Sequence, residues 1–142
     1  MPSAKKWSPF PGVKTFLLRL PVVSPVNRNR LLIHGHGGGY LYNPGEAGAM
    51  EAVSMAAYGG IKIVSVDYRM PPDHPYPAGL DDCMKVWKAT VETNDPKTLG
   101  LFGSSADAGM ALAMILRAKD EGLPTSTSFH PQFLQPAHAT CF

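Results

Sequence analysis

A serine that stands between a strand-like and a helix-like segment is the first candidate for chemistry in this sequence. Residues 99–109 read LGLFGSSADAG, so an apolar stretch passes through small residues into a stretch rich in Ala and Met. A sharp strand-to-helix turn of this kind lifts the side chain at its tip, here Ser105, toward a cleft. The amide of Ala106 then lies at a helix N-terminus, where N–H groups can hold a developing oxyanion. The same residues also fit a plain helix N-cap at Ser104 or Ser105, so both interpretations stay open.

The residue two places after this serine departs from the usual Gly-x-Ser-x-Gly spacing. Gly103 and Ser105 match that spacing, but Asp107 stands where the second glycine belongs. A side chain there adds bulk to a crowded turn and brings a negative charge near a site that must stabilise a negative transition state. A carboxylate in the first turn of a helix does suit the helix dipole, so the fold tolerates it. In a chain with complete catalytic machinery, replacing Asp107 by glycine should therefore raise activity.

A run of glycines follows an earlier apolar segment. Residues 36–39 read HGGG and come shortly after the apolar residues 31–34. Consecutive glycines let the backbone approach a ligand and turn its amides inward, so Gly37 and Gly38 could join Ala106 around a carbonyl oxygen. A flexible turn or a phosphate loop are the alternatives, although the Lys-Ser/Thr ending of a P-loop is missing. The position at the end of a strand, about 65 residues before Ser105, favours acyl-transfer chemistry.

A proline-rich segment lies between these two motifs. Residues 67–82 read DYRMPPDHPYPAGLDD, which by itself predicts a rigid loop that caps the next helix. Asp73 and His74 have the composition of a catalytic pair. Adjacent residues in a rigid loop rarely point at one nucleophile, so we do not assign them to a triad.

The elements that must position these motifs alternate along the chain. The apolar segments predicted as strands are residues 13–20, 31–34, 61–66 and 99–102. The segments predicted as helices are residues 45–58, 80–93 and 105–121, with glycines at the end of the first and the last. Strands separated by helix-length segments imply an α/β fold with a parallel sheet and helices on both faces.

Composition bounds the remaining possibilities. The 142 residues are 44% hydrophobic, which suits one globular domain. A net charge of +2 gives no argument for nucleic acid or an anionic membrane as partner. No apolar run approaches the roughly 20 residues of a membrane span, and no secretion signal is evident, so we expect a cytoplasmic protein. Cys83 and Cys141 are expected to be reduced thiols, and the five histidines lack the spacing of metal ligands.

Three segments together resemble the hormone-sensitive-lipase-like branch of the α/β-hydrolase fold family. Residues 36–39 resemble its HGGG motif, residues 68–82 its YRxxPxxPxPxxxxD segment, and residues 103–109 its GDSAGG elbow. The resemblance extends over residues 13–124. It implies a hydrolase of carboxylic esters or lactones that acts on a small-molecule ester and needs no cofactor or metal. The site residues that it implies are the nucleophile Ser105, the oxyanion donors Gly37, Gly38 and Ala106, and the supporting motif residues His36, Gly39 and Gly103.

The end of the chain departs from this family. Residues 125–142 have no hydrophobic period, whereas the family continues with an apolar strand and later supplies the acid and the histidine of its triad. Neither His130 nor His138 matches the family's histidine context, so no base is assigned. We therefore expect a single, incomplete domain: a lead-in at 1–12, the family-like part and an unpatterned tail, as in a truncated or frame-shifted esterase. A catalytically impaired ligand-binding relative or a non-functional fragment is the alternative, and an open sheet edge predicts self-association.

Overall fold

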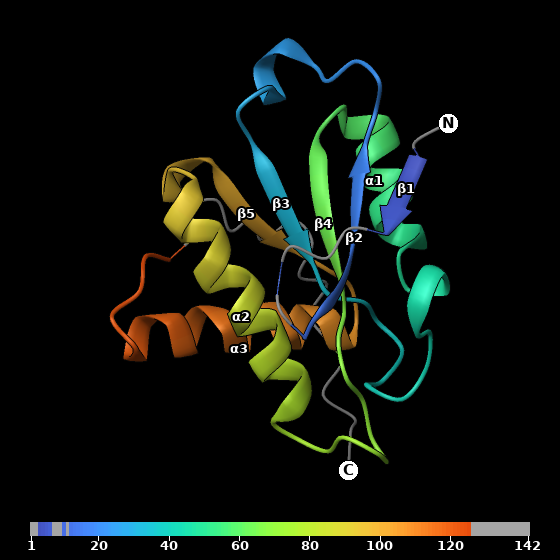
Figure 1. Cartoon of the computed structure of the whole chain (residues 1–142), viewed down its shortest axis with the longest axis vertical. Coiled ribbons are helices and arrows are strands. Elements are labelled where there is room, and N and C mark those ends of the chain that lie inside the picture. The colour runs from blue at the N-terminus through green and yellow to red at the C-terminus, as the bar shows by residue number, and fades with distance from the viewer. Residues whose placement is uncertain (1–2, 7–9, 11, 126–142) are drawn as a thin grey trace.

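A computed structural model describes residues 3–6, 10 and 12–125 of the chain. Its centre is a five-stranded sheet with the strand order β1-β2-β4-β3-β5 (Figure 1). The strands are β1 (Ser3–Lys6), β2 (Lys14–Arg19), β3 (Leu31–His34), β4 (Lys62–Asp67) and β5 (Leu99–Phe102). The pairs β3–β4 and β3–β5 are parallel, as predicted, whereas β1–β2 and β2–β4 are antiparallel. The α/β class is confirmed, and the sheet is mixed because β2 runs against the other four strands.

The helices are α1 (Met50–Gly59), α2 (Ala78–Thr93) and α3 (Ala106–Asp120), with short 3-10 turns at Pro25–Asn27, Gly45–Ala47 and Pro96–Thr98. Glycines end the first and the last helix, as the sequence predicts. Gly60 caps α1 with a φ of +55°, and Gly122 follows α3 with a φ of +67°. Both conformations are left-handed, and glycine adopts them without a steric penalty.

Two apolar clusters cover the two faces of the sheet. On one face α2 and α3, which cross each other in Figure 1, pack with Trp87 and Met114 against strand residues that include Leu101. On the other face α1 packs with Ala56 against residues that include Phe102. Successive strand residues point to opposite faces, which is why these neighbours of β5 belong to different clusters. The prediction of helices on both faces is confirmed.

The register of β3 and β5 decides where the functional loops begin. His34 pairs with Phe102, and both are the last residues of their strands. The strands are parallel, so the glycine loop after His34 and the serine turn after Phe102 leave the sheet at the same edge and the same level. Two motifs about 65 residues apart in sequence thus start side by side.

Two predictions on the chain ends are affected. The expected lead-in at 1–12 contains β1, whose Ser3 pairs with Arg19 and whose Lys6 pairs with Phe16. The segment SAKK lacks the apolar alternation that predicts a strand. It becomes a strand by pairing with the edge of β2, which the local sequence does not indicate. The tail, with His130, lies outside the described residues. None of the described helices has the length and apolar character that crossing a bilayer requires.

Candidate active site

The serine turn has the backbone geometry of a strained elbow. Ser105 joins β5 to α3 with φ +56° and ψ −122°. A left-handed φ in a residue with a side chain costs on the order of 1–3 kcal/mol, and such strain gathers at functional sites. Ser105 is exposed and makes no capping hydrogen bond, while the Ser104 hydroxyl donates to Glu51 Oε2 at 2.8 Å. Ser105 therefore occupies the N-cap position of α3 without a capping hydrogen bond from its side chain, and the Ser104 hydroxyl is bound to Glu51.

The glycine loop passes directly beside this elbow. A Cβ added to Gly37 would lie 3.1 Å from the Ser104 carbonyl oxygen and 3.7 Å from Ser105 Cβ. Gly38 has a φ of +120°, and a Cβ there would lie 2.6 Å from the Tyr42 carbonyl oxygen. The first contact calls for a small residue, and the second position calls for glycine in both conformation and space. The structure thus brings the predicted glycine loop and the predicted nucleophile together.

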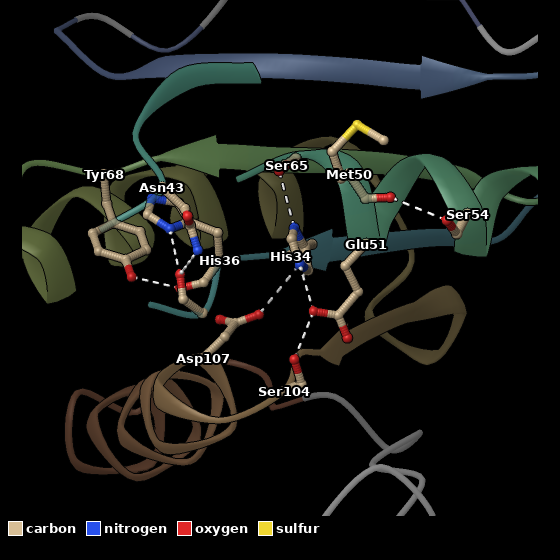
Figure 2. Close-up of polar contacts among 11 residues, drawn as sticks. His34, His36, Asn43, Met50, Glu51, Ser54, Ser65, Tyr68, Ser104 and Asp107 are labelled. Carbon is tan, nitrogen blue, oxygen red and sulfur yellow. Dashed lines mark hydrogen bonds and ion pairs between the residues drawn. The ribbon is translucent and has the colours of Figure 1, made fainter. Parts of the chain in front are cut away.

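Two tyrosines that the sequence analysis did not single out hold the loop in place. Tyr68, just after β4, donates its hydroxyl to the His36 carbonyl oxygen at 2.6 Å, and its ring stacks on the His36 ring with centroids 4.2 Å apart (Figure 2). Burial raises the pKa of Tyr68, so this donor stays protonated. Tyr40 donates its hydroxyl to the Ala106 carbonyl oxygen at 2.7 Å and so joins the loop to the first turn of α3. The sequence signal that could have singled out these two tyrosines is an aromatic residue directly beside a motif.

A buried polar cluster lies beneath the loop and the elbow (Figure 2). Nδ1 of His34, the last residue of β3, lies 3.0 Å from Ser65 Oγ. His34 Nε2 lies 3.5 Å from Glu51 Oε2 and 3.7 Å from Asp107 Oδ2. Burial lowers the pKa of His34, which favours the neutral ring. The close contact with His34, together with the hydrogen bond from Ser104, lowers the pKa of Glu51, which favours the carboxylate.

Asp107 differs from the expectation drawn from sequence. The residue is 1% exposed, and its carboxyl group lies under the elbow rather than in open solvent. Burial, and then the neighbouring charge of Glu51, raise the pKa of Asp107 well above its usual value. The expected negative charge beside the oxyanion amides is therefore replaced by a buried carboxyl group that favours its neutral form. The room for it comes from two glycines: a Cβ on Gly35 or on Gly103 would overlap the carboxyl group.

The proline-rich segment is the structural loop that the sequence predicts. Arg69 donates to both carboxylate oxygens of the buried Asp82, at 2.8 and 2.9 Å, and so fixes the segment to α2. Asp73 and His74 are both exposed. An apolar cavity of about 260 Å³ lies between this segment and α3, and Tyr40, which bonds to Ala106, forms part of its wall.

Comparison with known proteins agrees with this geometry. Residues 32–140 match the family described as alpha/beta hydrolase fold. The chain belongs to the α/β-hydrolase fold family. A carboxylesterase, NlhH, of Mycobacterium tuberculosis (strain ATCC 25618 / H37Rv) is 35% identical over 109 residues, which cover 70% of this chain and 34% of that protein. Tuliposide A-converting enzyme b1, amyloplastic, of Tulipa gesneriana is 31% identical over 142 residues, and the match covers 89% of this chain and 38% of that protein.

Solved structures of α/β hydrolases superpose on the described fold. The crystal structure of an esterase, E25, does so with a TM-score of 0.83 at 30% identity, over 87% of this chain and 38% of that one. A hormone-sensitive lipase from a metagenome library superposes with a TM-score of 0.78 at 26% identity, over 87% of this chain and 40% of that one. The resemblance stated from the sequence is thereby confirmed. The chain spans about a third of the length of the curated relatives it matches.

An α/β hydrolase with a serine nucleophile also needs a general base. In the part of the chain that the structure describes, none of His34, His36 and His74 hydrogen-bonds to Ser105. His130 and His138 lie outside that part. Nor do the described His, Cys, Asp and Glu side chains form a group of three or more that could hold a metal ion.

Proposed function

We propose that this α/β-hydrolase chain carries the nucleophile and the oxyanion hole of a serine hydrolase acting on carboxylic esters. Ser105 is the nucleophile, and the amides of Gly37, Gly38 and Ala106 receive the oxyanion. The observation that carries this proposal is the strained, exposed Ser105 with the glycine loop packed against its Cβ. Strain of this kind persists only where the surrounding structure enforces it, and here Tyr40 bridges the loop to the elbow.

In this mechanism the Ser105 hydroxyl oxygen attacks the carbonyl carbon of the ester, and its proton passes to a general base. The carbonyl π electrons move onto oxygen, and the three amides stabilise that negative charge. Collapse of the intermediate expels the alcohol and leaves an acyl group on Ser105, which water then removes. We assign no residue as the base, because none of the described histidines hydrogen-bonds to Ser105.

The supporting motif residues act on the backbone rather than on the substrate. Gly39 adopts a φ of +62° that lets the loop turn, and Gly103 leaves the room that Asp107 fills. His36 stacks on Tyr68, which fixes the start of the loop. The substrate is a small-molecule ester, a choice supported by relatives named carboxylesterase and acetyl-hydrolase.

A ligand-binding protein without turnover is the second candidate. It is favoured by one observation: no described histidine hydrogen-bonds to Ser105. Without a base, a serine hydroxyl is a weak nucleophile near neutral pH. We therefore expect the chain by itself to turn over esters poorly.

Covalent labelling tests the proposal. A fluorophosphonate should react slowly with Ser105: the serine oxygen forms a bond to phosphorus, the hydroxyl proton passes to solvent and fluoride leaves. Peptide fragmentation should place the added mass on that residue. Ser105→Ala should remove the label. Ser54→Ala, which alters another exposed serine, on α1, should keep it. Turnover of p-nitrophenyl acetate and butyrate, measured in parallel, should exceed the Ser105→Ala blank only slightly. Label on another serine, or equal labelling of Ser105→Ala, would overturn the assignment.

A further inference from the structure

The Asp107 carboxyl group lies between the two backbone segments that form the site. One oxygen faces Gly35, at the start of the glycine loop, and the other faces Gly103, at the start of the elbow. The Gly35 amide donates a hydrogen bond to this carboxyl group. Asp107 is itself the second residue of α3, so one side chain connects the loop that follows β3 to the helix that follows β5.

The groups that surround Asp107 come from every element packed against it. They are His34 at the end of β3, Glu51 on α1, Tyr40 in the glycine loop, Tyr68 after β4 and Cys83 on α2. With a neutral imidazole, none of them supplies a positive charge, and Glu51 supplies a negative one. Among the described residues, the buried atoms Asp107 Oδ2 and His34 Nε2 have no hydrogen-bond partner, and they lie 3.7 Å apart. Burial and the charge of Glu51 raise the pKa of Asp107 by more than the Gly35 hydrogen bond lowers it, so the carboxyl group favours its protonated form.

We propose that Asp107 is a positioning residue, whose buried carboxyl group fastens the glycine loop to the serine elbow. This inference rests on the proposed function, which assigns the oxyanion to amides close to both ends of the contact. Gly37 follows Gly35 by two residues, and Ala106 precedes Asp107 by one. The amides assigned to the oxyanion hole thus sit on the two segments that this one side chain joins. An ionised Asp107 would be repelled by the Glu51 carboxylate, and this repulsion would loosen the contact between the two segments.

This inference reverses the expected effect of glycine at position 107. Glycine would remove the bond to the Gly35 amide and leave a void between Gly35 and Gly103. Asparagine, in contrast, keeps the shape and an oxygen acceptor for that amide, and it never ionises. Asp107→Gly removes the contact of this side chain with Gly35 and Gly103, whereas Asp107→Asn removes only the ionisable proton. The two variants therefore separate these two effects. Asp120→Asn, an exposed acid at the end of the same helix, is the matched control.

Hydrogen exchange of the Gly35 amide tests the joint without any serine chemistry. We expect Asp107→Asn to keep its protection within about threefold of the unaltered chain, and Asp107→Gly to lose about tenfold or more. The Ser105 labelling rate with a fluorophosphonate should follow the same order, since misplaced oxyanion donors slow the reaction. Equal protection in the two variants would overturn the positioning role. Absence of label in the unaltered chain, with the expected exchange pattern, would count against the proposed function alone.

The pH dependence of the melting temperature tests the neutral form and serves if Asp107→Gly does not fold. The folded-state pKa of Asp107 is raised, so the native chain holds a proton that the unfolded chain releases above about pH 4. Stability of the unaltered chain is therefore lost as pH rises toward that folded pKa. Above about pH 4 the melting temperature of Asp107→Asn should rise with pH relative to that of the unaltered chain, while Asp120→Asn should show no such trend. A constant difference for Asp107→Asn, or the opposite slope, would refute a protonated Asp107.

Discussion

Gly103 sets the shape of the elbow by the absence of one methyl group. Its missing Cβ is the space that the Asp107 carboxyl group occupies, so the two positions are coupled. We expect Gly103→Ala to destabilise the chain by about 1–3 kcal/mol, the usual cost of overpacking. In the Asp107→Gly background the same change should cost clearly less, because the added methyl group then enters free space.

Urea unfolding of the two single variants and the double variant measures this coupling as a cycle. Gly59→Ala, at the end of α1 with only one side-chain neighbour near 3.3 Å, should change stability little and serves as the control. Strict additivity of the two changes would show that the side chain of Asp107 does not occupy the place assigned to it.

The sequence could predict that the serine turn and the glycine loop meet, but it could not predict the state of Asp107. Motif spacing alone located Ser105 and the glycine loop, since these depend on local backbone demands. The burial and neutral form of Asp107 depend on Gly35, Gly103 and Glu51, which lie on three other segments. No local sequence pattern indicates that Gly35 and Gly103 face the same carboxyl group.

At the scale of elements, two strand ends are held in register by contacts of a third segment. Tyr68 follows β4, yet its hydroxyl donates to the His36 carbonyl oxygen in the loop after β3. We expect Tyr68→Phe to leave a buried carbonyl unsatisfied and to cost about 1–3 kcal/mol of unfolding free energy. Tyr76→Phe, which removes the hydroxyl of an exposed tyrosine, should be nearly neutral. Equal urea midpoints for both variants would contradict the structural role of Tyr68.

The elements were predictable to different degrees for a physical reason. Leu31–His34 and Leu99–Phe102 are short apolar runs bounded by polar residues and glycines, and their bounds match the prediction. Ser3–Lys6 carries no apolar pattern, and it becomes a strand through backbone pairing with β2. β2 is antiparallel to both of its neighbours, β1 and β4. This direction likewise follows from pairing between segments, which the residues do not encode locally.

At the scale of the whole molecule, the far edge of the sheet determines a last expectation. Within the described residues β5 pairs with β3 alone, and a cavity of about 270 Å³ lies beside it, lined by Leu32, Met55 and Phe102 among others. An apolar strand edge with such a neighbouring hollow is a template for pairing with another chain. We therefore keep the prediction that the 142-residue chain self-associates through β5.

Met55→Lys places a charge in that hollow and should lower the apparent molar mass, because an ammonium group resists burial between two chains. Tyr58→Lys adds the same charge on the same helix at a residue that is 94% exposed, so it should leave the mass unchanged. Light scattering after size exclusion, over a range of concentrations, measures both. The two variants also bring equal net charge, so a general gain in solubility would lower association in both alike. A monomeric unaltered chain at every concentration, or equal behaviour of the two lysine variants, would show that the β5 edge is not the surface through which copies meet.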